Sequence, residues 1–207
     1  MLGIVDYGMG NIFSLMNAAR TLNIKSTIIS KPEKLNKCDA IILPGVGAFG
    51  DAMDRLKSNN FVEAINEFKN TGKFILGICL GMQLLTDKSF EFGEHKGLGL
   101  VDGNCIRFSK NNSDSKVIIP HTMWNNINLV KKDVDIFANT PNNAYMYFTH
   151  SFFTQRINKK EVISWTTYAG TDFCSAFQKD NIIGFQFHPE KSGEQGLNLL
   201  NNFWEII

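Results

Sequence analysis

Short, mostly apolar runs alternate with segments of helical periodicity along the first half of the chain. The runs predict strands at Leu2–Val5, Ser26–Ser30, Ala40–Leu43 and Phe74–Ile78. The segments between them predict helices, which are Asn11–Leu22 (capped by Asn11), Phe61–Lys69 and Leu80–Thr86. Because strands that are apolar throughout and alternate with helices are typical of parallel sheets, we expect a parallel sheet covered by helices on both faces.

The second half is richer in strand signals, and several of its segments alternate between apolar and polar residues. The predicted strands are Cys105–Phe108, Val117–Ile119, Tyr145–Thr149, Val162–Tyr168, Phe173–Gln178 and Ile182–Phe187. A last helix is predicted at Gly193–Ile207, with a buried stripe of Leu197, Leu200, Phe203, Trp204 and Ile207. The pattern therefore predicts an α/β fold: an open, twisted, mostly parallel sheet flanked by helices, with extra antiparallel strands in the second half.

Composition narrows the class of protein. The chain has 207 residues, 43% of them hydrophobic and 20% charged, and a formal net charge of +1. We expect a single domain over residues 1–207, with no electrostatic attraction to nucleic acid or to an anionic membrane. The longest apolar run, Phe74–Met82, is too short to span a bilayer, and the start of the chain lacks a basic region typical of a signal. A cytoplasmic protein is expected.

The segment Gly77-Ile78-Cys79-Leu80-Gly81 follows an apolar strand and leads directly into a predicted helix. It is the thiol counterpart of the nucleophile elbow, in which small flanking residues let the strand and the helix approach each other closely. A helix N-terminus behind Cys79 favours a thiolate and directs peptide N–H groups toward a developing oxyanion. The alternative is a buried structural cysteine.

A cysteine nucleophile requires a base, and His188 directly follows a predicted strand. Glu190 lies two residues further on, where a carboxylate could orient the imidazole. Taken alone, a histidine in a loop is more often incidental. A second glycine-rich strand end, Pro44-Gly45-Val46-Gly47, is either an ordinary turn or a source of oxyanion donors. Ligands bind beyond the carboxyl ends of parallel strands, so we expect this segment to lie beside Cys79.

Two other kinds of site are disfavoured. A dinucleotide-binding loop around Gly8 and Gly10 would need a third glycine where Phe13 stands, and an acidic residue after the second strand. No histidine or cysteine pair has the spacing typical of metal ligands, and no C-x-x-C motif occurs. We therefore expect no metal and no cofactor, and we expect reduced thiols.

Five segments in order resemble the class I, or triad-type, glutamine amidotransferases over essentially the whole chain. The resemblance is strongest to the glutaminase subunits that serve imidazole glycerol phosphate synthase in histidine biosynthesis. The segments are Asp6–Asn11 with Ser14, Pro44–Gly47, Gly77–Leu84, Tyr147–Ser151 and Gln186–Ser192. The valine in Pro44–Gly47 is typical of this subfamily, since other members usually carry P-G-G there.

The resemblance implies that Cys79 attacks the carboxamide of L-glutamine, that His188 transfers the proton and that Glu190 orients His188. It places the oxyanion at the backbone of Gly45, Val46 and Leu80. It also assigns a set of glutamine-binding residues, which are Gly47, Gln83, His150, Ser151 and Phe152. Three further positions would face a partner protein: Asn11, Trp124 and Lys191.

The resemblance also names the partner. The motifs occupy nearly all of the chain, so a separate subunit is expected to consume the ammonia: a cyclase with a (β/α)₈ barrel, in a heterodimer. That cyclase would make imidazole glycerol phosphate and aminoimidazole carboxamide ribonucleotide.

The sequence departs from the subfamily pattern at two places, and the first of them weakens the choice of partner. The subfamily's P-H-M-G-W-N segment has Thr122 and Met123 here, and Phe152 replaces a usual tyrosine. The alternative is a paralogue that feeds another synthase, for example one that builds amidines on amino sugars. Outside this chemistry, a cysteine peptidase on a related sheet is disfavoured because Leu80 stands where such enzymes usually carry histidine. A non-catalytic binding module is disfavoured because Cys79, His188 and Glu190 are all present.

Overall fold

The computed structural model describes residues 1–109, 118–130, 134–155 and 157–207. Its helices are α1 (Ile12–Thr21), α2 (Phe49–Ser58), α3 (Phe61–Asn70), α4 (Leu80–Leu84) and α5 (Gly193–Glu205). Short 3₁₀ turns occupy Pro32–Lys37, Asp135–Phe137 and Pro189–Lys191. The strands are β1 (Leu2–Val5), β2 (Ser26–Ile29), β3 (Ala40–Leu43), β4 (Phe74–Ile78), β5 (Thr86–Ser89), β6 (His95–Lys96), β7 (Val101–Arg107), β8 (His121–Asn126), β9 (Asn128–Leu129), β10 (Tyr145–His150), β11 (Phe152–Gln155), β12 (Val162–Tyr168), β13 (Thr171–Lys179) and β14 (Ile182–Phe185).

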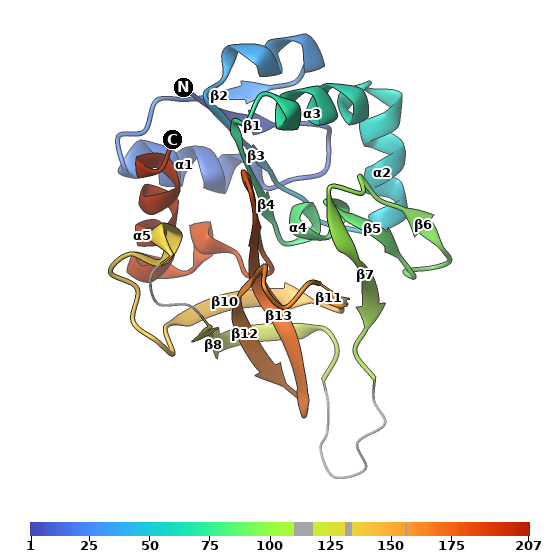
Figure 1. The fold of residues 1–207 in the computed structure, drawn as a ribbon, viewed down its shortest axis with the longest axis vertical. Coiled ribbons are helices and arrows are strands. Elements are labelled where there is room, and N and C mark those ends of the chain that lie inside the picture. Colours follow the sequence, from blue (N-terminus) through green and yellow to red (C-terminus); the bar gives the residue numbers. More distant parts are fainter. Residues whose placement is uncertain (110–117, 131–133, 156) are drawn as a thin grey trace.

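An eight-stranded sheet forms the centre of the molecule, in the order β2-β1-β3-β4-β14-β13-β12-β9 (Figure 1). The first five strands in this order are parallel, and the last three pair antiparallel. Because parallel neighbours end at one edge, the residues that follow β1, β3, β4 and β14 come together there. The predicted fold class, a mostly parallel sheet with antiparallel strands from the second half, is confirmed.

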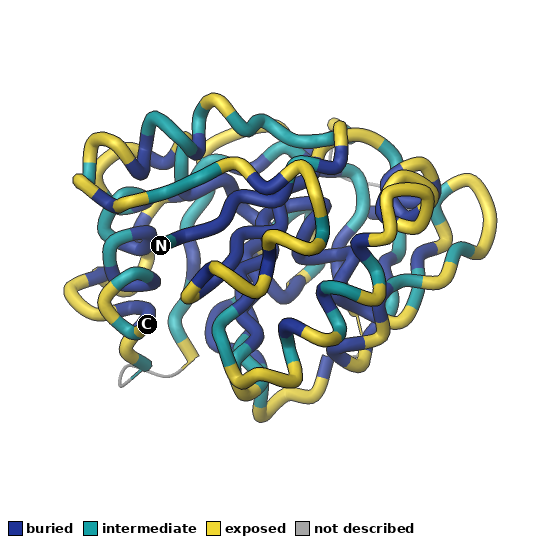
Figure 2. Tube along the Cα trace, turned by 90° about the horizontal axis from the view of Figure 1, so that it is seen from above, coloured by how far each residue is buried: buried dark blue, intermediate teal, exposed yellow. Residues whose placement is uncertain are grey.

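Helices cover both faces of this sheet. Alternate residues of the strands belong to separate cores: Ile42 packs with α1 and α5, whereas Ile41 packs with α2, α3 and α4. Figure 1 places α1 and α5 together on one side, and Figure 2 shows the buried strands inside more exposed outer segments. A strand buried on both faces needs apolar residues at successive positions, which explains the uninterrupted apolar runs in the sequence.

Two smaller sheets extend the central one: β11-β7-β5-β6 and the two-stranded β10-β8. Strand β10 runs to His150 and β11 begins at Phe152, so one short turn joins these two sheets. None of the helices in the described ranges has the length and apolar character needed to cross a membrane.

Several predicted boundaries are wrong. Helix α4 ends at Leu84 rather than Thr86, because the Thr86 hydroxyl donates to the Gln83 carbonyl and the chain turns into β5. The predicted strand Val117–Ile119 lies partly outside the described residues, and its described part is not a strand. Helix α5 ends at Glu205, and Ile207 is exposed.

Several elements carried no prediction of their own: α2 and the strands β5, β6, β8, β9 and β11. Helix α2 includes Gly50 and several charged residues, so its apolar stripe is short. The hairpin of β5 and β6 lies in a charged, glycine-bearing segment.

Candidate active site

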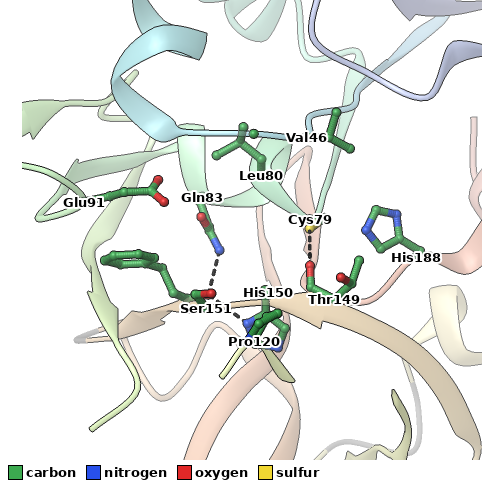
Figure 3. Close-up of a pocket in the computed structure, with 12 residues that line it drawn as sticks. Val46, Cys79, Leu80, Gln83, Glu91, Pro120, Thr149, His150, Ser151 and His188 are labelled. Carbon is green, nitrogen blue, oxygen red and sulfur yellow. Dashed lines mark hydrogen bonds between the residues drawn. The ribbon is translucent and has the colours of Figure 1, made fainter. Parts of the chain in front are cut away.

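A cavity of about 270 Å³ opens at the carboxyl ends of the parallel strands (Figure 3). The structure brings together there most of the residues proposed for chemistry and for glutamine binding. Those that line the cavity are Val46, Gly47, Cys79, Leu80, Gln83, His150, Ser151, Phe152 and His188. They come from loops after β3, β4 and β14 and from the turn between β10 and β11, so distant parts of the sequence form one site.

Cys79 is the single residue between β4 and α4, and its backbone is in an unusual conformation. Its φ is 54° and its ψ is −111°, which non-glycine residues rarely adopt. The two flanking glycines make this possible: a Cβ on Gly81 would lie 1.8 Å from the Leu43 carbonyl oxygen, and one on Gly77 would lie 2.6–2.8 Å from its neighbours. The predicted strand-to-helix elbow is therefore present, with its small residues where close approach requires them.

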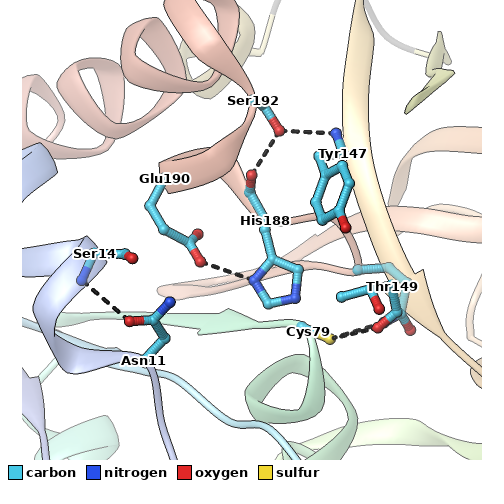
Figure 4. Close-up of polar contacts among 9 residues, drawn as sticks. Asn11, Ser14, Cys79, Tyr147, Thr149, His188, Glu190 and Ser192 are labelled. Carbon is cyan, nitrogen blue, oxygen red and sulfur yellow. Dashed lines mark hydrogen bonds and ion pairs between the residues drawn. The ribbon is translucent and has the colours of Figure 1, made fainter. Parts of the chain in front are cut away.

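The imidazole of His188 lies between Cys79 and Glu190, with Nε2 on the side of Cys79 and Nδ1 hydrogen-bonded to Glu190. Nδ1 of His188 is 2.8 Å from Oε1 of Glu190, and both side chains are almost fully buried. Nε2 of His188 is buried without a hydrogen-bond partner in the described part of the chain, and Figure 4 shows the imidazole directed toward Cys79. The backbone N–H of His188 donates to the Tyr147 carbonyl at 2.9 Å, which fixes the residue against β10.

The charges around His188 set its protonation. Burial by itself lowers the pKa of His188, but the neighbouring Cys79 sulfur and the Glu190 carboxylate outweigh burial and raise that pKa to about 10. An imidazolium at this place can act as the counter-ion of a thiolate and as the acid for a leaving group.

The segment Pro44–Gly47 lies beside the elbow, as predicted. A Cβ on Gly45 would lie 2.8 Å from the Cβ of Leu80 and 2.9 Å from the Gly81 nitrogen. The Val46 N–H, however, donates to the Met9 carbonyl at 3.3 Å. The peptide between Gly45 and Val46 must rotate before this N–H can donate to a ligand in the cavity.

The side chain of Gln83 is held in one orientation. Its Nε2 donates to the Phe152 carbonyl at 2.8 Å and to Oε1 of Gln186 at 3.0 Å. Both amide hydrogens are used, so Oε1 is left as an acceptor for the cavity. His150, predicted to bind glutamine, contributes its ring to the wall of the cavity, but its Nδ1 donates to the Phe152 carbonyl at 2.8 Å.

Glu91 and Gln186 are polar residues of the site to which the sequence assigned no role. Glu91 lines the cavity, and its Oε2 accepts the Phe49 N–H at the start of α2 at 2.8 Å. Gln186, in the segment before His188, donates to the Cys79 sulfur at 3.8 Å. Nothing in the local sequence marks Glu91, because it lies in a hairpin rich in other charged residues. Gln186 could have been suspected from its place in Gly184–Glu190.

The residues expected to face a partner surround one segment outside the cavity. Asn11 caps α1, since its Oδ1 accepts the Ser14 N–H at 3.3 Å, and Figure 4 shows it near Glu190. Lys191 is exposed, and Trp124 is 49% exposed and lies beside Gly193. Lys191 belongs to the short turn that carries Glu190, Asn11 lies near Glu190 and Trp124 lies beside the residue that starts α5.

The remaining thiols differ from Cys79. Cys38, Cys105 and Cys174 are free and buried outside the cavity. Burial raises the pKa of both Cys105 and Cys174 to about 12. Within the described ranges, no group of three or more histidine, cysteine or acidic residues is arranged to hold a metal ion.

An open, mostly parallel sheet with a cysteine elbow facing a buried histidine–carboxylate pair is typical of thiol-dependent α/β enzymes. The chain matches the family described as "Glutamine amidotransferase class-I" over residues 3–206. It belongs to that family.

The curated relatives and the solved structures agree with this membership. The chain is 45% identical over 206 residues to the imidazole glycerol phosphate synthase subunit HisH of Wolinella succinogenes, with all of both chains covered. It is 45% identical to the HisH subunit of Sulfurimonas denitrificans, covering 98% of this chain and 97% of the relative. A structure of PurLQS from Thermotoga maritima has a TM-score of 0.76 at 20% identity and covers 99% of this chain and 97% of that one, which supports the fold.

Proposed function

We propose that this chain is the glutaminase subunit of an imidazole glycerol phosphate synthase. It hydrolyses L-glutamine to glutamate and ammonia, and it passes the ammonia to a second subunit of histidine biosynthesis. The observation that carries the chemistry is the arrangement of Cys79, His188 and Glu190 around the elbow. The relatives named as HisH support the pathway.

The first half-reaction forms a thioester. The Cys79 thiolate adds to the carboxamide carbon of glutamine, and the C–N bond breaks as Nε2 of His188 gives its proton to the leaving nitrogen. Ammonia departs and the glutamyl group remains on the sulfur. Glu190 holds Nδ1–H of His188 at 2.8 Å and so keeps Nε2 directed at the sulfur.

The second half-reaction releases glutamate. His188, now neutral, takes a proton from water, the resulting hydroxide adds to the thioester carbon, and the C–S bond breaks to return the Cys79 thiolate. Both steps pass through an oxyanion. The Leu80 N–H, at the free start of α4, is one proposed donor, and the Val46 N–H becomes the second once it leaves the Met9 carbonyl.

Glutamine recognition follows from the polar groups around the cavity. Glu91 supplies a carboxylate and Gln83 supplies Oε1, and Figure 3 shows both side chains on the same side of the cavity. We assign this pair to the α-ammonium group of glutamine. The α-carboxylate is assigned to the backbone of Gly47, Ser151 and Phe152, which line the same cavity.

The proposed partner is a cyclase subunit with a (β/α)₈ barrel, bound as a heterodimer at Asn11, Trp124 and Lys191. In the resting structure the Val46 N–H is held by Met9, so we expect the isolated chain to hydrolyse glutamine slowly. Docking of the partner would release this N–H and restore a donor whose absence costs about 3–4 kcal/mol. A cytoplasmic location remains a prediction.

The alternative, a different synthase as partner, rests on Thr122 and Met123, which are exposed on β8. One measurement separates the two partners. Glutamate release should rise strongly when the histidine-pathway cyclase and its nucleotide ligand are added. Activation by an amidine-forming synthase instead would overturn the assignment of pathway but not that of glutaminase chemistry.

The chemistry itself is tested with Cys79→Ala. Glutamate release should be abolished, whereas synthesis by the complex from added ammonium salts should continue, because the thiol is not needed once ammonia is present. Cys174→Ala is the matched control, since that thiol is also buried but lies outside the cavity. Substantial hydrolysis of glutamine by Cys79→Ala would disprove the role of this residue.

A further inference from the structure

Two buried histidines that the proposed chemistry does not use lie side by side: His150 in the wall of the cavity and His121 next to it. His121 on β8 and His150 on β10 are directly opposite in the antiparallel pair, and Nδ1 of His121 is 3.0 Å from Nε2 of His150. His121 is fully buried, and its ring is stacked against Phe148 and Tyr168 with centroid distances of 4.9 Å and 3.9 Å. A space-filling role would need the stacking but not the hydrogen bonds.

The direction of each hydrogen bond follows from the fixed acceptor at one end. The Phe152 carbonyl can only accept, so Nδ1 of His150 carries a hydrogen and Nε2 of His150 is an acceptor. Nδ1 of His121 must then be the donor to it, which leaves Nε2 of His121 to accept from the Asn125 amide at 3.2 Å. The chain runs one way, from Asn125 through both imidazoles to the Phe152 carbonyl.

Both rings are neutral in this arrangement. Burial lowers the pKa of His121 to about 4 and contributes most to lowering that of His150 to about 3. Each ring therefore has one hydrogen, and both carry it on Nδ1. Nε2 of His150 is an acceptor whose donor is Nδ1–H of His121, so loss of the His121 ring would leave this nitrogen without a donor.

The far end of this chain reaches the glutamine cavity. The Phe152 carbonyl accepts from His150 and also from Nε2 of Gln83, both at 2.8 Å. These two bonds fix the carbonyl between them. The orientation of the Gln83 amide, and so the acceptor Oε1 that it presents to the cavity, depends on where this carbonyl lies.

We infer that His121 is a positioning residue for glutamine: through His150 it holds the Phe152 carbonyl, which in turn orients the Gln83 amide toward the α-ammonium group of the substrate. This inference rests on the proposed function. His121 touches neither the substrate nor the reacting atoms. It lies on β8, and the exposed side of the same strand carries Trp124.

Two variants separate positioning from packing. His121→Phe keeps an aromatic ring between Phe148 and Tyr168 but removes the donor to His150. His121→Asn loses the stacking but keeps a donor near the place of Nδ1. Without that donor the Phe152 carbonyl is less well fixed, the Gln83 amide can turn, and the hydrogen bond that we assign between its Oε1 and the α-ammonium group of glutamine is weakened; loss of one such bond changes binding by about tenfold. We expect His121→Phe to raise the KM for glutamine about tenfold, with kcat changed less than about twofold. We expect His121→Asn to have a KM close to the wild-type value.

A second measurement needs no variant. In ¹⁵N spectra of the imidazole rings of the whole chain, both His121 and His150 should show the hydrogen on Nδ1, whereas the half-buried His95 serves as an internal comparison. If either buried ring carries its hydrogen on Nε2, the inference is wrong. It is also wrong if folded His121→Phe retains the wild-type KM, or if His121→Asn binds glutamine as poorly as His121→Phe. Failure of the wild-type complex to hydrolyse glutamine would instead overturn the proposed function, but it would not change the assignment of the hydrogens on His121 and His150.

Discussion

The carboxylate of Glu91 has two roles, one structural and one in substrate binding, and two substitutions can distinguish them. Oε2 accepts the Phe49 N–H, and α2 has no side-chain cap of its own because Ala48 precedes it. The same carboxylate lines the cavity, where we assign it to the α-ammonium group of glutamine. Glu91→Gln removes the charge but keeps an oxygen that can accept the Phe49 N–H, whereas Glu91→Ala removes both.

The expected sizes follow from these contacts. A hydrogen bond between charged groups contributes about 1.5–3 kcal/mol, so Glu91→Gln should raise the KM for glutamine roughly 10- to 100-fold. Loss of a helix cap costs about 0.5–2 kcal/mol, which for a chain of this size lowers the Tm by roughly 1–8 °C. Only Glu91→Ala should show this second effect.

The assay is glutamate release by the complex over a wide range of glutamine concentration, together with thermal unfolding of each variant. Glu94→Gln is the matched control, because Glu94 lies in the same hairpin and pairs with Lys88 at the surface. A wild-type KM in Glu91→Gln would refute the assignment to the ammonium group. Equal Tm values for Glu91→Gln and Glu91→Ala would show that the bond to Phe49 does not stabilise α2.

Three further predictions concern the triad, the elbow and the partner. In an NMR titration, the His188 ring should lose its proton near pH 10, and Cys79→Ala or Glu190→Gln should lower that midpoint because each removes a negative neighbour that raises the pKa; a wild-type midpoint near 6.5 would contradict this. Gly81→Ala should cost several kcal/mol in urea unfolding because its Cβ meets the Leu43 carbonyl, whereas Gly72→Ala, in open space at a φ of +78°, should cost only about 1–2 kcal/mol. Lys191→Ala should weaken activation by the cyclase without changing glutamate release by the isolated chain, and unchanged activation would remove Lys191 from the interface.

The parts of the fold that could be predicted are those whose signal is local. Strands buried on both faces need unbroken apolar runs, so Leu2–Val5, Ala40–Leu43 and Phe74–Ile78 were predicted with their observed bounds. The elbow at Cys79 was equally visible, because close approach of strand and helix requires glycine at fixed neighbouring positions.

Features that depend on contacts distant in sequence could not be predicted. From their spacing along the chain, His121 and His150 could only be judged unsuitable as metal ligands. These two residues are 29 positions apart in the sequence, and they are in contact because β8 pairs with β10. Glu91 reaches the cavity only through the fold of a hairpin whose sequence pattern is dominated by exposed charges. The engagement of the Val46 N–H by Met9 likewise joins two loops whose relative position depends on the sheet order.

Only one of the four cysteines lines the cavity, so covalent labelling can be used to count competent sites. At most 1% of the surface is exposed in each of the other three, Cys38, Cys105 and Cys174. Cys79, in contrast, lies in the wall of an open cavity. An electrophile shaped like glutamine should therefore attach once per folded chain, and intact-mass spectrometry should show a single adduct. The fraction of chains that carry it measures the active enzyme in a preparation, independently of any partner-dependent turnover.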